Sequence, residues 1–157
     1  MTRPEWNRYF LGIAQAVSTR ATCPRLSVGA VIVSPEHRIL STGYNGAPPG
    51  ADHCLDKGCE IVDGHCIRAL HADRNAILFA RADLKGATLY LWGGPPCLHC
   101  AQDIVTVGIV RVISRGDYVS VEILRGVDFL ERNGVGVKQL RGDGSMERDM
   151  YYGRGEP

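Results

Sequence analysis

The stretch A-T-L-Y-L-W-G-G-P-P-C-L-H-C, residues 87–100, joins a β-rich run to a turn and the start of a helix. Its first six residues are mostly large apolar or aromatic side chains, which favour a buried strand. The Gly-Gly-Pro-Pro that follows is typical of a turn, and proline is favoured where a helix begins. We therefore expect a strand over 87–92 followed by a buried helix over 97–108.

The flanking sequence continues this alternation of strands and helices. Trp6, Phe10 and Val17 recur at helical spacing, and two β-rich runs are joined by Pro-Glu-His, which is typical of a hairpin. The pattern predicts helices over residues 4–19, 71–83 and 118–132, and strands over 27–34, 38–44, 109–114 and 135–140. Alternating strands and helices imply an α/β domain, with a hairpin entering a sheet whose other strands are joined by crossovers.

Two segments stand apart from this pattern. Residues 45–66 are rich in Gly, Pro, Asp and Cys, and an irregular segment of that length inside a compact domain is usually functional or clamped. Residues 141–157 are polar and contain several glycines, so we expect a loosely held tail. We assign residues 1–140 to a single domain, because the chain shows no internal repeat and no linker.

Charge and hydropathy narrow the class of protein. The net charge is +1, so no general attraction to nucleic acid or to an anionic membrane is expected. The first residues lack the apolar run of a signal peptide, and no apolar run is long enough to span a bilayer. We expect a cytoplasmic protein.

Six cysteines in 157 residues point to a metal. In a reducing compartment, clustered cysteines are more often metal ligands than disulfide partners. Cys97 and Cys100 form a C-x-x-C pair at the start of a helix, where the helix dipole favours thiolates. If the two central helices pack side by side, His71 joins this pair around a zinc ion that keeps one position for water. The alternatives are a redox-active cysteine pair and a histidine that only caps a helix or fills the core.

Asp73, two residues after His71, and the proline before Cys97 complete the pattern H-x-acid…P-C-x-x-C. With glutamate as the acid, this pattern is the signature of zinc-dependent deaminases. The chain resembles the deoxycytidylate (dCMP) deaminases of the cytidine deaminase superfamily, the bacterial and phage enzymes in particular. The resemblance runs from about Trp6 to Leu140 and rests on T-C-P-R-L-S-V-G-A-V-I-V, S-T-G-Y-N-G-A-P-P-G, D-G-H-C-I-R-A-L-H-A-D-R-N-A-I-L, P-P-C-L-H-C and V-G-I-V-R-V-I-S.

This resemblance implies a three-layer α/β/α fold in which helices flank a mixed five-stranded sheet. It implies zinc-dependent hydrolysis of dCMP to dUMP with release of ammonia, a step in pyrimidine nucleotide metabolism that supplies dTTP. The implied zinc ligands are His71, Cys97 and Cys100. Asp73 occupies the position of the acid that carries protons between water, the ring nitrogen and the leaving ammonia.

The resemblance also implies positions that bind the substrate. Asn45 matches an asparagine that hydrogen-bonds the sugar hydroxyl. Arg25 matches a basic residue near the 5′-phosphate, which a guanidinium can bind through two hydrogen bonds; the alternative is a solvated loop arginine. Arg115, at the end of a strand, is a candidate for a phosphate or effector contact or for a surface role.

The cysteine-rich segment allows a second metal site. Its cysteines, with His53 or His65, could hold a structural zinc, as in some relatives, and Cys23 matches a position used for such a site in certain phage enzymes. The segment's cysteines are Cys54, Cys59 and Cys66. The alternative is three buried free thiols that pack as small apolar side chains.

One position departs from the family, which has glutamate where this chain has Asp73. A misplacement of about 1 Å, on the scale of one methylene, can cost about a hundredfold in rate. Three explanations compete. The chain is a natural variant whose backbone or an extra water restores the reach of the acid, or an enzyme with reduced activity or a different substrate. Otherwise it is a protein that keeps zinc and nucleotide binding without turnover. An active hydrolase is favoured because an acid is retained and the rest of the site is complete.

The same fold also supports other functions. They are deamination of another base, such as guanine or a modified cytosine, and nucleotide binding or regulation without catalysis. A tRNA-editing role is less favoured, because the charge is near zero and no basic stripe is present. By resemblance we expect a homo-oligomer, a hexamer, with dCTP and dTTP as effectors and the G-Y-N-G-A-P segment near the effector site.

Overall fold

A mixed five-stranded sheet forms the centre of the computed structural model, which describes residues 2–140; the expected tail over 141–157 lies outside the described residues. The sheet has the order β2-β1-β5-β6-β7. Its strands are β1 (Gly29–Val33), β2 (Ile39–Tyr44), β5 (Thr88–Trp92), β6 (Arg111–Arg115) and β7 (Gly136–Leu140). Strand β1 pairs antiparallel with β2 and β5, whereas β5, β6 and β7 run parallel. The expected mixed sheet is confirmed.

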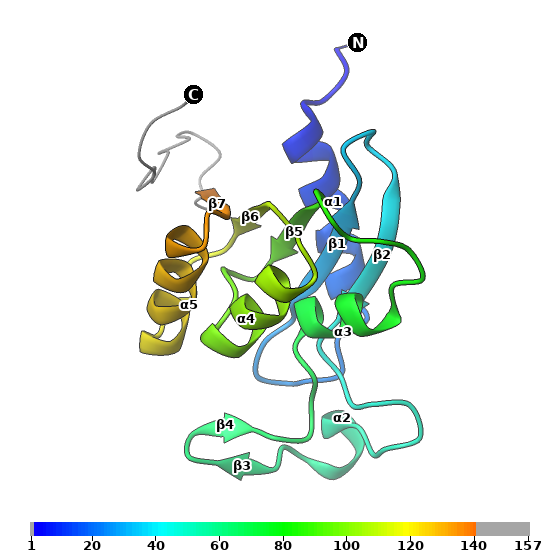
Figure 1. Ribbon diagram of the computed structural model, residues 1–157. Helices are drawn as coiled ribbons and strands as arrows, with labels where there is room; N and C mark the ends of the chain where they lie inside the picture. The colour runs from blue at the N-terminus through cyan, green and yellow to red at the C-terminus, as the bar shows by residue number, and fades with distance from the viewer. Residues whose placement is uncertain (1, 141–157) are drawn as a thin grey trace.

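Helices cover both faces of this sheet (Figure 1). The longer helices within residues 2–140 are α1 (Trp6–Ser18), α3 (Ala72–Phe79), α4 (Leu98–Thr106) and α5 (Val121–Arg132). Helix α1 packs on one face, and the other three lie on the opposite face, so the three-layer arrangement is confirmed. None of the helices in the described part of the chain is long and apolar enough to cross a membrane.

Strand β1 shows why the sheet is covered on both sides. All five of its residues are buried, as expected for a central strand between two helical layers. Ala30 and Ile32 belong to the core shared with α3 and α4. Val31 and Val33 point to the opposite face and pack with Phe10 of α1.

Two glycines allow the helices that carry the candidate site to lie close to their neighbours. A Cβ at Gly43 in β2 would overlap the carbonyl oxygen of Ala72 and the backbone nitrogen of Ala76 in α3. A Cβ at Gly126 in α5 would overlap the carbonyl oxygen of Pro96, just before α4. These close approaches fix where α3 and α4 begin.

Helix α3 ends at Phe79, earlier than the expected end at residue 83. Ala80 has an extended conformation with ψ of 134°. The backbone N–H of Lys85 donates to the Asp83 carboxylate at 3.0 Å, and this turn brings Leu84, only 5 % exposed, into the core. Burial of Leu84 therefore outweighs the helix propensity of the preceding Ala-Arg-Ala segment.

The segment expected to be irregular has short elements of its own. We call residues 46–70 the insertion. It contains α2 (Cys54–Lys57) and a hairpin of β3 (Ile61–Val62) and β4 (His65–Cys66). Gly46 and Leu70 close its base with two backbone hydrogen bonds of 3.2 and 2.9 Å. Figure 1 shows the insertion below the sheet and helices α3 and α4.

A candidate metal-dependent active site

Three possible metal ligands meet where α3 and α4 begin. His71 is the N-cap of α3 and Cys97 is the N-cap of α4. The Nδ1 atom of His71 lies 3.5 Å from Sγ of Cys97 and 3.4 Å from Sγ of Cys100. All three ligand atoms lie within 4.8 Å of one another. His71 is 26 positions from Cys97 and 29 from Cys100 along the chain, and the structure brings the three side chains together from the starts of two helices.

The charges of this group suit a cation. Hydrogen bonding, chiefly from Cys100 and then from His71, lowers the pKa of Cys97 to about 3, so this sulfur is a thiolate. The hydrogen bond with Cys97 raises the pKa of His71 to about 9. The pKa of Cys100 is raised, because it shares a hydrogen bond with Cys97 and is buried. The start of α4 also stabilises negative sulfur through its dipole.

The donor set fits zinc. One imidazole nitrogen and two cysteine sulfurs are ligands that zinc prefers in proteins. Among residues 2–140, no further His, Cys or carboxylate group lies within 4.8 Å of all three atoms. Three protein ligands are the number found at catalytic zinc sites, where the remaining position takes water.

Asp73 supplies a buried acid beside this group. It lies in the first turn of α3, is only 4 % exposed, and accepts a hydrogen bond of 2.9 Å from the backbone N–H of Arg74. Burial raises the pKa of the Asp73 carboxyl, although the charge of His71 acts in the opposite direction. A carboxyl with a raised pKa takes up a proton more readily than an exposed aspartate. The group can therefore receive and release protons.

A cavity of about 260 Å³ opens beside these residues and is lined by His71, Asp73 and Cys97. The rest of its wall comes from the loop after α1, the end of β2, the insertion, the turn between β5 and α4, and the start of α5 with the loop before it. These lining residues include Arg25, Leu26, Val28, Asn45, Gly64, His65, Cys66, Tyr118, Ser120 and Glu122. Tyr118 lies in a loop, because α5 begins at Val121 and not at residue 118 as expected, and no motif in the sequence marked it as a site residue.

Asn45 lines the cavity and also holds the loop after α1. Its Oδ1 accepts from the backbone N–H of Val28 at 2.8 Å, and its Nδ2 donates to the carbonyl of Leu26 at 2.7 Å. A hydrogen bond from Asn45 to a sugar hydroxyl stays a prediction. Asn75, which the sequence analysis did not single out, donates to the carbonyl of Tyr44 at 2.8 Å and ties α3 to the end of β2.

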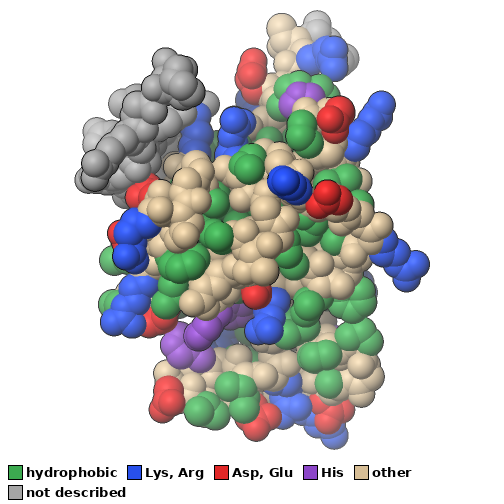
Figure 2. Space-filling model, in the orientation of Figure 1, with side chains coloured by type: hydrophobic (Ala, Val, Ile, Leu, Met, Phe, Trp, Pro, Cys, Tyr) green, Lys and Arg blue, Asp and Glu red, His purple; other side chains and the backbone are tan. Residues whose placement is uncertain are grey.

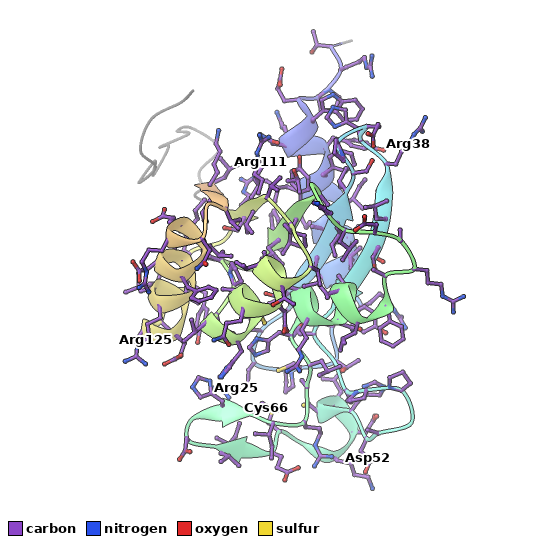
Figure 3. The ribbon with its side chains drawn as sticks, in the orientation of Figure 1. Arg25, Arg38, Asp52, Cys66, Arg111 and Arg125 are labelled. Carbon is purple, nitrogen blue, oxygen red and sulfur yellow. The ribbon has the colours of Figure 1, made fainter. Side chains whose placement is uncertain are left out.

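The two candidate arginines lie in different places. Arg25 is exposed, lines the cavity, and donates from both terminal nitrogens to the carbonyl of Gly64 at 3.3 Å. Figure 3 shows Arg25 near Cys66, where the insertion meets the helices. Arg115 lies at the end of β6, 5.5 Å from the ring centroid of Trp92, and is not among the residues that line this cavity.

A second group of thiols lies in the insertion. Its three sulfurs lie within 4.8 Å of one another, and two of them, on Cys54 and Cys66, are 3.5 Å apart. The third belongs to Cys59. His53 bonds instead to the hydroxyl of Thr22 at 3.0 Å, and neither it nor His65 joins the group in the described part of the chain.

The sequence is similar to several proteins whose activity is named. The family model described as "Cytidine and deoxycytidylate deaminase zinc-binding region" matches residues 4–115. The chain is 39% identical to the ComE operon protein 2 of Bacillus subtilis over 91% of its length and 75% of that protein. It is 44% identical to the deoxycytidylate deaminase of Mycobacterium phage D29 over 72% of its length and 96% of that protein.

The fold is similar to that of a solved structure from the same group. The dCMP deaminase of cyanophage S-TIM5, crystallised in complex with dCMP and dUMP, aligns with a TM-score of 0.73 and 30% identity. The alignment covers 89% of this chain and all of the cyanophage chain. The likeness therefore extends over the sheet, the helices and the site at their edge.

Proposed function

Because the chain belongs to the cytidine and deoxycytidylate deaminase family, we propose that it hydrolyses dCMP to dUMP and ammonia with one zinc ion. In this reaction the bond between C4 and the amino nitrogen breaks, water supplies the oxygen at C4, and the amine leaves as ammonia. Support comes from the phage D29 relative, which is named a deoxycytidylate deaminase, and from the cyanophage structure, which holds dCMP and dUMP.

The residues of the cavity divide the chemistry between them. Held by His71, Cys97 and Cys100, zinc supplies Lewis acidity that lowers the pKa of water toward neutrality. The Asp73 carboxylate takes a proton from the attacking water and delivers it to N3 of the ring. It then passes a proton to the amino group, which leaves as ammonia. The burial that raises the pKa of Asp73 suits a group that must gain and lose a proton in each turnover.

The observation that carries this proposal is the position of Asp73 in the same cavity as the metal-binding side chains. The test is to incubate the zinc-loaded chain with dCMP and to follow ultraviolet absorbance and released ammonia. Asp73→Asn should abolish both signals while zinc stays bound, because the amide cannot carry the proton. Asp103→Asn, which changes a half-buried aspartate of α4 outside the cavity, is the matched control. A wild-type chain that releases no ammonia would defeat the proposal.

We propose the following substrate contacts. Arg25 binds the 5′-phosphate, since its guanidinium lines the cavity and is accessible to solvent. Asn45 bonds the sugar hydroxyl through the free lone pair of its carbonyl oxygen. Arg115 contacts a phosphate or an effector outside the cavity, at the end of β6.

The aspartate at position 73 favours a second candidate, deamination of another or a modified base. A shorter acid reaches a different distance from the ring, so a base that sits closer to α3 would suit it. A panel of cytosine, guanine, adenine and modified-cytosine nucleotides separates these substrates by the ammonia released. Nucleotide binding without ammonia from any of them would identify a regulatory binding protein instead.

We further propose a cytoplasmic homo-oligomer, a hexamer, regulated by dCTP and dTTP, with residues 43–48 near the effector site. Exposed apolar side chains on α3, Leu78 and Phe79, support association, because they are 60% and 55% exposed. On the face shown in Figure 2, basic and acidic side chains are interspersed, which fits a mononucleotide substrate better than a polymer. Sedimentation with and without dCTP tests the assembly, and a stable monomer would count against it.

A further inference from the structure

The segment that follows α1 forms one wall of the candidate cavity. At its start, Arg25 is held by two hydrogen bonds of 3.3 Å to the carbonyl of Gly64. Leu26 and Val28 follow on the same wall, and Asn45 is bonded to both of them. A nucleotide whose phosphate lies at Arg25, and whose base reaches the metal-binding group, has its sugar between the two. The sugar therefore lies against Leu26, Val28 and Asn45.

Val28 is the part of this wall that is packed most firmly. It contacts the core cluster that contains Ala72, the residue between His71 and Asp73. On another side it meets the turn after β5, where a Cβ at Gly93 would lie only 2.9 Å from Cγ2 of Val28. The side chain of Val28 is thus held between the core and this turn, and it cannot move aside for a ligand without a loss of packing.

Asn45 takes up hydrogen-bonding groups of the same wall. Its Nδ2 donates to the carbonyl of Leu26 at 2.7 Å, and its Oδ1 accepts from the backbone N–H of Val28 at 2.8 Å. Its backbone N–H donates to the carbonyl of Val28 at 3.3 Å. Both side-chain bonds go to one three-residue stretch, so they use the outer edge of the amide. One lone pair and one N–H remain, on opposite sides of the side chain.

The polar side chains at the start of α5, which also line the cavity, have partners of their own. Oγ of Ser120 accepts from the backbone N–H of Ile123 at 3.3 Å. The carboxylate of Glu122 accepts from Arg125 at 3.1 Å. A sugar hydroxyl that turned toward this helix would have to compete with these bonds.

We propose that Val28, together with Leu26, makes the site selective for 2′-deoxyribose, an inference that rests on the proposed function. The 3′-hydroxyl donates to the remaining lone pair of Asn45. Because the 2′- and 3′-carbons are bonded to each other, a 2′-hydroxyl would lie beside Asn45, against Val28 and Leu26. Neither of these side chains can hydrogen-bond, and the remaining N–H of Asn45 is on the far side of its amide. The 2′-hydroxyl would lose water without a replacement.

The affinities of dUMP and UMP, the deoxyribose and ribose forms of the product, measure this selectivity without any need for turnover. Each is titrated by calorimetry into the zinc-loaded full-length chain. UMP should bind about a hundredfold more weakly, which is the discrimination an apolar pocket reaches against an added hydroxyl. UMP that binds as tightly as dUMP would overturn the proposal, and so would a chain that binds neither.

A third ligand separates lost hydrogen bonding from lack of space. The 2′-fluoro analogue of dUMP carries fluorine where UMP has its hydroxyl, and fluorine is weakly hydrated and donates no hydrogen bond. It should bind within about fivefold of dUMP, since its burial leaves no strong polar group without a partner. An analogue that binds as weakly as UMP would overturn the proposal, because bulk alone would then exclude the hydroxyl.

The substitution Val28→Thr tests the residue itself. It replaces one methyl group of the wall with a hydroxyl of similar size that can bond the 2′-hydroxyl. The ratio of the two Kd values, UMP over dUMP, should fall from about a hundredfold to about tenfold. Val119→Thr, at an exposed residue that does not line the cavity, is the matched control and should keep the wild-type ratio. An unchanged ratio in Val28→Thr would overturn the role of Val28.

Turnover distinguishes this inference from the proposed function. Ammonia release by the wild type should give a kcat/KM for dCMP about a hundredfold above that for CMP, the ribonucleotide, and about tenfold above it in Val28→Thr. Equal kcat/KM values for the two substrates in the wild type would overturn the selectivity. If the wild-type chain deaminates neither, the proposed function fails, whereas the affinities for dUMP and UMP still decide the role of Val28.

Discussion

Asp73 is almost completely buried, which is rare for an aspartate unless its carboxylate is hydrogen-bonded or paired. Its carboxylate is bonded to the backbone of its own helix, and α3 is fixed in turn by its contact with Gly43. The acid therefore cannot move toward the ring by a shift of the helix without a loss of packing. Because α3 is held in place, the shorter side chain of Asp73 alone determines how far the carboxylate extends toward the ring.

We expect Asp73→Glu to raise kcat for dCMP, by up to about a hundredfold, because the returned methylene restores reach of about 1 Å. The measurement is steady-state ammonia release, with zinc content determined on the same sample. A fall in kcat at unchanged zinc would show that the backbone around position 73 is adjusted to the shorter acid.

Arg25 is the residue proposed to bind the negatively charged 5′-phosphate of the substrate. Arg25→Ala should raise KM for dCMP by roughly tenfold to a hundredfold, the loss expected for hydrogen bonds to a charged group. KM for deoxycytidine should change little, because that substrate has no phosphate. Arg38→Ala, at the opposite end of the molecule in Figure 3, is the matched control. Equal effects on both substrates would assign Arg25 a purely structural role.

Among the elements, the contact between β2 and α3 controls the position of His71 and Asp73. Gly43→Ala should lower the free energy of unfolding by about 1–3 kcal/mol, because the new methyl group overlaps the backbone of α3. Gly12→Ala in α1 is the counterpart, since a Cβ there meets nothing within 4 Å. It should raise stability by about 1 kcal/mol through helix propensity. Urea denaturation measures both, and equal effects would contradict the close approach at Gly43.

The long elements could be predicted from sequence because their patterns are local. The strand at 88–92 and the helix after Cys97 follow from apolar runs and proline placement, and the meeting of His71 with Cys97 follows from the motif. The hairpin of the insertion could not, because two-residue strands have no periodicity. The dual bonding of Asn45 to Leu26 and Val28 joins segments far apart in sequence, which residue type alone does not specify.

For the whole molecule, the exposed apolar side chains of α3 bear on assembly. Phe79→Lys should reduce the sedimenting mass of the proposed oligomer, since a charge in a closely packed contact is costly. Val119→Lys, at an exposed apolar residue of the loop before α5, is the control for added charge. If neither change alters the mass, α3 does not form the subunit contact.

The closed base of the insertion has a consequence for how such a chain can diversify. Gly46 and Leu70 are hydrogen-bonded to each other, so the chain leaves and re-enters the domain at nearly one point. A segment attached in this way is a module: it can be lengthened, shortened or replaced by grafting without displacing β2 or α3. Since it supplies one wall of the cavity, exchange of the module would alter the size of substrate admitted while the catalytic machinery stays in place.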